Sequence, residues 1–148
     1  MRPLFVYGTL LPERPNYYLL EDVVMILESA TLADAVLYDM GGALMLMHHA
    51  GSSVKGVLVS VSAEDYDQTV ARLDRLEVYD PADPENSLYL REVCEVLLED
   101  GTLSEAWVYV GKLKHVQRLT PFGGDWALYS AENKEALEAF WENRKQAG

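Results

Sequence analysis

Asp100 and Gly101 separate two runs of alternating apolar and polar residues, residues 89–99 and 104–110. An Asp-Gly pair favours the tight turn that joins antiparallel strands, so this segment predicts a β-hairpin. Further strand-like runs occupy residues 4–7, 31–38, 43–48 and 55–61, and residues 50–53 predict a second hairpin between the last two. Strands without regular helix alternation favour an α+β fold with a curled, partly closed antiparallel or mixed sheet over a doubly wound parallel one.

Length and charge limit the class of protein. The chain has 148 residues, 49% of them hydrophobic, which predicts a single domain over residues 1–148 with a sizeable core. A net charge of −12 would repel nucleic acid and anionic membrane surfaces. Cys94 is the only cysteine, so it forms no intrachain disulfide, and it is expected to be a small buried apolar residue. The absence of a signal-length or membrane-spanning apolar stretch predicts a soluble cytoplasmic protein.

Residues 63–79 have the spacing of an amphipathic helix. Ser62, with Asp65 three residues later, predicts the N-terminal cap. Glu77 falls on the inward side of this helix, close to the centre of its apolar stripe. The stripe consists of Tyr66, Thr69, Val70, Leu73 and Leu76. A carboxyl group that faces inward loses hydration, which moves its pKa toward neutrality and suits it to proton transfer.

Two segments complete the predicted organisation. Residues 80–87 contain two prolines and several turn-forming polar residues, so they predict a loop directly after Glu77. Ser130 predicts the cap of a final helix. That helix would carry Leu137, Phe140, Trp141 and Arg144 on one side.

The sequence gives little support for a metal site, a nucleophilic serine or a phosphate-binding loop. His48 and His49 are neighbours in a predicted strand, so their side chains point to opposite faces and do not chelate one metal together. With only His115 besides, no metal site is expected. The serines form no nucleophile-elbow pattern, and Gly41 and Gly42 lack the spacing of a phosphate-binding loop.

Six short motifs resemble, in order, those of the γ-glutamylcyclotransferase-like family, which includes γ-glutamylamine cyclotransferases and AIG2-like proteins. The first two are Phe-Val-Tyr-Gly-Thr-Leu at residues 5–10 and Leu-Asp-Arg-Leu-Glu at residues 73–77. The others are Val-Lys-Gly-Val-Leu at 54–58, Tyr-Leu-Arg at 89–91, Ala-Trp-Val-Tyr-Val at 106–110 and Gly-Asp-Trp at 124–126. Together they cover most of the chain.

The resemblance implies a small barrel-like mixed sheet flanked by helices, and an enzyme that converts a γ-glutamyl amine or γ-glutamyl amino acid to 5-oxoproline and free amine. It implies that neither a cofactor nor a metal takes part. It also implies a site in which Glu77 is the general acid/base. The implied substrate-binding residues are Tyr7, Gly8, Thr9, Leu10 and Tyr89.

The implied cyclisation needs few kinds of catalytic residue. The substrate carries its own nucleophile, the α-amine, and its own electrophile, the γ-carbonyl, so the enzyme chiefly orients them and moves protons. One carboxyl group would take a proton from the α-ammonium and return a proton to the leaving amine. A glycine turn at a strand end would let backbone N–H groups approach the substrate closely.

Two features depart from the family pattern. Many members follow this glutamate with glycine, whereas Val78 and Tyr79 follow here, so a different backbone path after Glu77 is expected. The loop at residues 80–88 is also longer than in compact members, and it is expected to be either a lid or a surface excursion. Its carboxylates Asp80, Asp83 and Glu85, with the neighbouring Asp74, would favour a cationic leaving amine if they lined the entrance.

Two other classes of function remain open. A protein of this fold could bind a small carboxylate metabolite without turning it over. A protein-interaction module could instead use the strand hairpins as its binding surface, with Glu77 as a structural residue. An inward glutamate beside the turn at residues 7–10 disfavours the interaction module, because a scaffold has no need for a desolvated carboxylate. The sequence carries no signal for the leaving amine or the oligomeric state.

Overall fold

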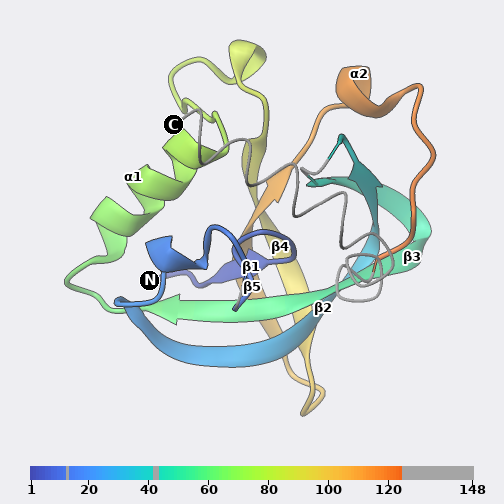
Figure 1. The fold of residues 1–148 in the computed structure, drawn as a ribbon. Coiled ribbons are helices and arrows are strands. Elements are labelled where there is room, and N and C mark those ends of the chain that lie inside the picture. Colours follow the sequence, from blue (N-terminus) through green and yellow to red (C-terminus); the bar gives the residue numbers. More distant parts are fainter. Residues whose placement is uncertain (13, 42–43, 125–148) are drawn as a thin grey trace.

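The computed structural model describes residues 1–12, 14–41 and 44–124. In this part of the chain, five strands form a closed barrel in the order β1-β3-β2-β4-β5 (Figure 1). The strands are β1 (Leu4–Val6), β2 (Val24–Asp39), β3 (Leu44–Val61), β4 (Leu90–Leu98) and β5 (Leu103–Val110). The helical elements are η1 (Tyr17–Leu19), α1 (Tyr66–Leu76), η2 (Pro84–Asn86) and α2 (Leu113–Val116).

The barrel closes where β1 lies parallel to β5, with Leu4 opposite Trp107. All other strand pairs are antiparallel, so the sheet is mixed. The predicted α+β fold with a small barrel-like mixed sheet is therefore confirmed. The hairpin around Asp100 and Gly101 is also present, because β4 and β5 pair along their length and Gly101 takes a φ of 89°. Among the described residues, no helix is long and apolar enough to cross a membrane.

The predicted hairpin through residues 50–53 is wrong. Residues 44–61 form one long strand, and both of its halves pair with β2, as in Leu37 with Leu46 and Ala30 with Gly56. The register shifts between Ala33 and Ala35, where Asp34 has a φ of 56° and its carboxylate accepts a hydrogen bond from Gly51 N–H. Turn-forming residues here bend a two-stranded ribbon, and the long curved pair β2–β3 is visible in Figure 1.

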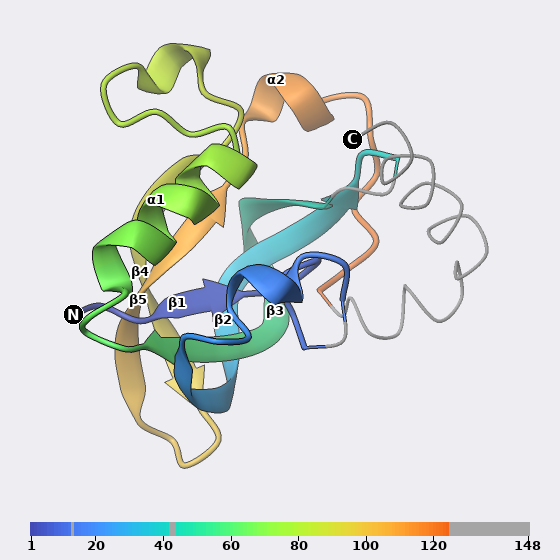
Figure 2. The ribbon, with the colours of Figure 1, turned by 60° about the vertical axis from the view of Figure 1, so that its left-hand side comes forward.

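Two apolar clusters follow from the alternation of side chains along the strands. Phe5 and Tyr7 of the first strand segment point into the barrel, while Leu4 and Val6 point outward. The outward cluster also contains Leu73 of α1. Figure 2 shows α1 against the side of the barrel where β1, β4 and β5 lie. The barrel therefore has an inner core, and α1 covers a second core on its outer surface.

The α1 helix is shorter than the prediction of residues 63–79, since it spans Tyr66–Leu76 and Glu77 is its C-cap. Asp65 occupies the N-cap position without a side-chain capping bond, and the Ser62 hydroxyl donates to Asp65 Oδ2 over 2.8 Å. The predicted Ser62 cap is therefore wrong by one turn. The predicted helix from Ser130, and Asp125 and Trp126 of the late motif, lie outside the described residues.

Candidate active site

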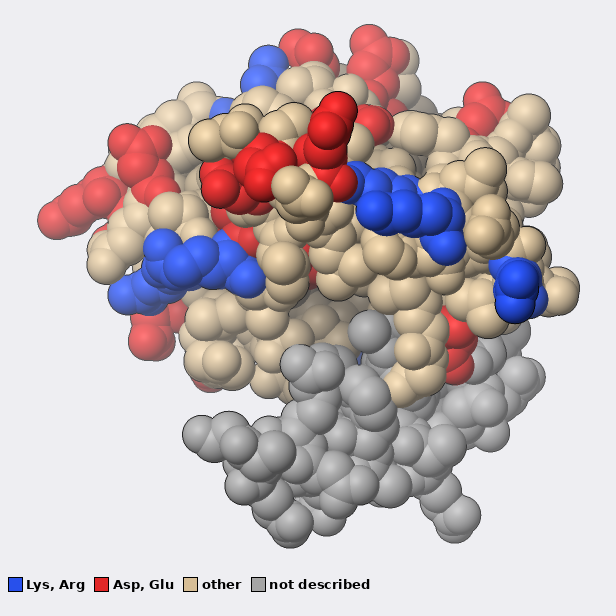
Figure 3. Space-filling model, turned by 90° about the horizontal axis from the view of Figure 1, so that it is seen from above, with Lys and Arg blue, Asp and Glu red and all other residues tan. Residues whose placement is uncertain are grey.

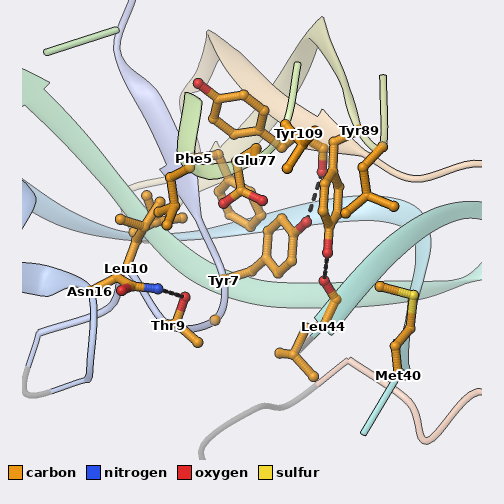
Figure 4. A pocket seen from close by; sticks show the side chains of 15 residues that line it. Phe5, Tyr7, Thr9, Leu10, Asn16, Met40, Leu44, Glu77, Tyr89 and Tyr109 are labelled. Atoms are coloured by element: carbon orange, nitrogen blue, oxygen red, sulfur yellow. Dashed lines mark hydrogen bonds between the residues drawn. The ribbon is translucent and has the colours of Figure 1, made fainter. Parts of the chain in front are cut away.

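One cavity of about 190 Å³ lies between the end of β1 and the end of α1. Its lining includes every residue of the predicted site: Tyr7, Gly8, Thr9, Leu10, Glu77 and Tyr89. The prediction that Glu77 and the turn at residues 7–10 border one pocket is therefore confirmed, although nearly seventy residues separate them in sequence. Figure 4 shows this cavity from close by.

The carboxyl group of Glu77 points into the cavity beside the rings of Phe5, Tyr7 and Tyr89 (Figure 4). Burial raises the pKa of Glu77 from 4.5 to about 7. Its backbone N–H donates to Leu73 O over 2.9 Å, but its carboxylate makes no hydrogen bond or ion pair within the described residues. An unpaired, desolvated carboxyl group with this pKa exchanges a proton readily near neutral pH.

Three tyrosines around Glu77 have their hydroxyl hydrogens committed to protein acceptors. Tyr7 donates to Tyr109 O over 2.7 Å, Tyr89 donates to Leu44 O, and Tyr109 donates to Asp74 Oδ1 over 2.7 Å. Burial, as the first cause, raises the pKa of all three hydroxyls above their ordinary value. These hydroxyls stay neutral near neutral pH. Among the described residues that line the cavity, Glu77 is therefore the ionisable group whose pKa lies near neutrality.

The turn after β1 is fixed by its own hydrogen bonds. Leu11 N–H donates to Gly8 O over 3.0 Å, and Asn16 reaches Thr9 twice, from its backbone N–H and from its side-chain amide. Within the described residues, the N–H groups of Gly8, Thr9 and Leu10 make no hydrogen bond. A rigid turn with free N–H groups suits the binding of a carboxylate or a developing oxyanion.

Gly8 does not adopt the backbone conformation that requires glycine. Its φ is not positive, so its turn does not need the conformational freedom of glycine. A Cβ at this position would lie 3.1 Å from Leu44 Cδ1, a tight contact in the wall of the cavity. Glycine avoids this contact with Leu44.

Asp74 is buried and does not line this cavity. Only 8% exposed, it accepts hydrogen bonds from Arg91 Nε at 2.9 Å, Arg91 Nη2 at 3.3 Å and the Tyr109 hydroxyl. The Arg91 guanidinium stacks over Trp107 at 4.2 Å from the ring centroid. The Asp74 carboxylate therefore ties α1 to β4 and β5, and it is not available to attract a cationic amine. Its position four residues after Val70 is the sequence signal for its burial, although not for its partners.

The backbone after Glu77 follows a left-handed path although glycine is absent. Val78 has a φ of 52°, Val78 N–H donates to Arg75 O, and Tyr79 N–H donates to Asp74 O. This hydrogen-bond pair is the Schellman motif, in which glycine is the usual residue at the left-handed position. The valine therefore adopts a strained conformation at this position.

The loop at residues 80–88 folds back on itself. Asp80 N–H donates to Ser87 Oγ, Asn86 donates to the Asp83 carboxylate, and Lys112 Nζ donates to the carbonyl oxygens of Pro84 and Glu85. Leu88 N–H then pairs with Val78 O over 2.8 Å, and both residues line the cavity. Figure 3, which looks down on the molecule, shows acidic and basic side chains side by side on this face.

A separate group of possible metal ligands lies away from this cavity. His48, Glu92 and Cys94 are the residues in the described part of the chain whose ligand atoms come together. None of them lines the cavity that contains Glu77. His49 and His115 do not join the group, as expected for His49 from its position next to His48 in a strand.

Comparison with known proteins agrees with this geometry. The family described as "Gamma-glutamyl cyclotransferase, AIG2-like" matches residues 4–128. The γ-L-glutamyl-butirosin B γ-glutamyl cyclotransferase of Niallia circulans is 30% identical over 139 residues, which cover 93% of this chain and 83% of that protein.

Solved structures share the fold at lower identity. YkqA from Bacillus subtilis superposes with a TM-score of 0.66 at 20% identity, over 90% of this chain, which spans only 42% of the length of YkqA. A structure named γ-glutamyl cyclotransferase gives a TM-score of 0.54 at 15% identity, over 81% of this chain and 69% of its own. The barrel, the cavity and the family match over residues 4–128 agree, and the chain belongs to the γ-glutamyl cyclotransferase, AIG2-like family.

Proposed function

We propose that this protein cyclises a γ-glutamyl amide to 5-oxoproline and releases the amine, with Glu77 as the general acid/base. The observation that supports this proposal most strongly is the Glu77 carboxyl group, which has no partner among the described residues. Burial raises its pKa to about 7, and it lies in the same cavity as the turn at residues 7–10. A structural carboxylate at this depth normally has a partner, because an unpaired one destabilises the fold.

The reaction begins with a proton transfer. The Glu77 carboxylate takes a proton from the substrate α-ammonium, and the neutral amine attacks the γ-carbonyl carbon to form a new C–N bond. The γ-carbonyl oxygen becomes an oxyanion. The N–H groups of the turn at residues 8–10 have no acceptor in the described part of the chain, so they are suited to stabilise it, since the neighbouring tyrosine hydroxyls already donate to protein acceptors.

The second half of the reaction reverses the proton transfer. As the tetrahedral intermediate collapses and the original amide C–N bond breaks, the Glu77 carboxyl group gives its proton to the leaving nitrogen. Glu77 then takes the remaining excess proton from the ring nitrogen and passes it to the amine, which leaves as an ammonium ion. The products are 5-oxoproline and the free amine, and Glu77 returns to its starting state. No oxidant, reductant or water molecule is consumed, so the chemistry balances with these groups alone.

The size of the cavity supports a substrate whose leaving group extends outside it. A volume of about 190 Å³ is below the range of roughly 300–1,000 Å³ that is typical of pockets for drug-sized ligands, so we assign it to the glutamyl moiety. The relative from Niallia circulans is named for a γ-glutamyl conjugate of butirosin B. Leaving amines on larger molecules therefore belong in the substrate screen, beside small amines, lysine and amino acids.

The test is turnover by the wild type and by Glu77→Gln. The variant keeps the size of the side chain but does not shuttle protons, so turnover should fall by roughly 10²–10⁴-fold, the usual effect of losing a general acid/base. Free amine and 5-oxoproline are measured together, and binding of 5-oxoproline should survive in the variant. Equal turnover by the variant and the wild type would refute the role of Glu77. Binding of 5-oxoproline without any turnover by the wild type would favour a non-catalytic binder.

A further inference from the structure

Three side chains with different metal-binding atoms lie together on β3 and β4. They are His48 of β3 and Glu92 and Cys94 of β4. An imidazole nitrogen, a carboxylate oxygen and the Cys94 sulfur all lie within 4.8 Å of one another. His48 Nε2 and Glu92 Oε2 are already in contact at 2.9 Å.

The alternation of strand residues explains why these three side chains share one side of the sheet. Leu46 of β3 and Val96 of β4 point into the barrel. His48 lies two residues beyond Leu46, and Cys94 and Glu92 lie two and four residues before Val96, so all three face the same way. Cys94 packs against the inner core, whereas the His48 and Glu92 side chains are 54% and 40% exposed. The group therefore sits at the rim of the barrel, open to solvent on one side.

The combination of atoms selects one class of cation. Nitrogen, sulfur and carboxylate oxygen at about 2.0–2.3 Å are the ligands of zinc, whereas calcium and magnesium prefer oxygen alone. Three ligands at such distances would lie roughly 3.5 Å apart, so a shift of about 1 Å by the exposed His48 and Glu92 side chains brings the group to that spacing. Three protein ligands leave a fourth position open to solvent, as zinc sites that bind water or a small ligand do.

From this arrangement we infer that His48, Glu92 and Cys94 form a binding site for Zn²⁺ at the rim of the barrel. On binding, the cation replaces the hydrogen bond between His48 and Glu92, and the Cys94 thiol releases its proton to become a thiolate ligand. Burial and the nearby Glu92 raise the pKa of the Cys94 thiol, and the charge of the cation reverses this balance. The site is independent of the proposed reaction because none of its residues lines the Glu77 cavity.

The test uses cobalt as a spectroscopic substitute for zinc. Chelator-treated full-length protein is titrated with Co²⁺, which gives a thiolate-to-cobalt charge-transfer band when a cysteine binds it. We expect one cobalt per chain with this band, and loss of the band when Zn²⁺ is added. Cys94→Ser should abolish the band, and His48→Ala should weaken Co²⁺ binding at least tenfold.

His49→Ala is the matched control, because its side chain lies on the opposite face of the same strand. It should bind Co²⁺ like the wild type. Glu92→Gln removes a ligand from the exposed side of the site, so it also tests the inference if Cys94→Ser does not fold. Absence of the thiolate band in the wild type, or equal binding by the His48→Ala and His49→Ala variants, would overturn the inference.

Discussion

Two carboxyl groups at the same end of α1 have opposite environments. Asp74 is buried and accepts hydrogen bonds from Arg91 and Tyr109. Glu77, three residues later, faces a cavity and makes no hydrogen bond or ion pair with its carboxylate within the described residues. Burial alone therefore does not identify a reactive carboxyl group. The donors around Asp74 give it a structural role, and the lack of partners leaves the Glu77 carboxyl group free for chemistry.

The largest expected effect on stability comes from the paired carboxylate. Asp74→Ala removes the acceptor for Arg91 and Tyr109 and leaves a largely buried guanidinium uncompensated. Breaking a buried ion pair in this way costs about 3–5 kcal/mol of unfolding free energy, which urea denaturation can measure. Asp67→Ala, at an exposed position of the same helix, is the control and should cost less than about 1 kcal/mol.

The same urea denaturation experiment also tests the role of Glu77. Glu77→Gln should leave the unfolding free energy unchanged or raise it slightly, because a neutral amide costs less to bury than an unpaired carboxylate. If Glu77→Gln destabilised the protein as much as Asp74→Ala, the two carboxyl groups would both be structural. The contrast between a structural Asp74 and a reactive Glu77 would then be wrong.

A smaller effect is expected at Val78, directly after Glu77. A β-branched residue at a φ of 52° is strained, and Val78 as a whole is 57% exposed, so little packing is lost when its side chain is removed. Val78→Gly should therefore stabilise the protein by about 1 kcal/mol, measured by urea denaturation.

Val93→Gly provides a control of opposite sign. Val93 is an exposed valine within β4, where glycine weakens a strand, so this variant should be destabilised. A loss of stability in Val78→Gly as well would show that the backbone after Glu77 does not store strain.

Sequence reasoning succeeded where a local pattern was sufficient. Asp100 and Gly101 specified their hairpin through turn chemistry alone, and the apolar stripe of α1 placed Glu77 on the inward side of the helix end. The meeting of Glu77 with the turn at residues 7–10 came from the family resemblance, because nothing local links segments so far apart.

The errors have a common physical cause. Gly51 has turn-forming neighbours, but turn chemistry does not specify a strand's partner, and both flanking segments pair with β2. The sequence left open whether Asp74 lines the cavity entrance, because its partners, Arg91 and Tyr109, are 17 and 35 residues away in sequence. Whether a carboxyl group is paired depends on tertiary contacts of this kind, which periodicity does not encode.

The most direct test of the account is an NMR titration of the Glu77 carboxyl group in the folded, ligand-free protein. Burial predicts a pKa of about 7, above the ordinary value of 4.5. Folding would then favour the protonated form, so the wild type should lose stability relative to Glu77→Gln as pH rises from about 4.5 to about 7, and no further above that. A Glu77 pKa near 4.5 in the folded protein would contradict the assignment of this residue as the acid/base.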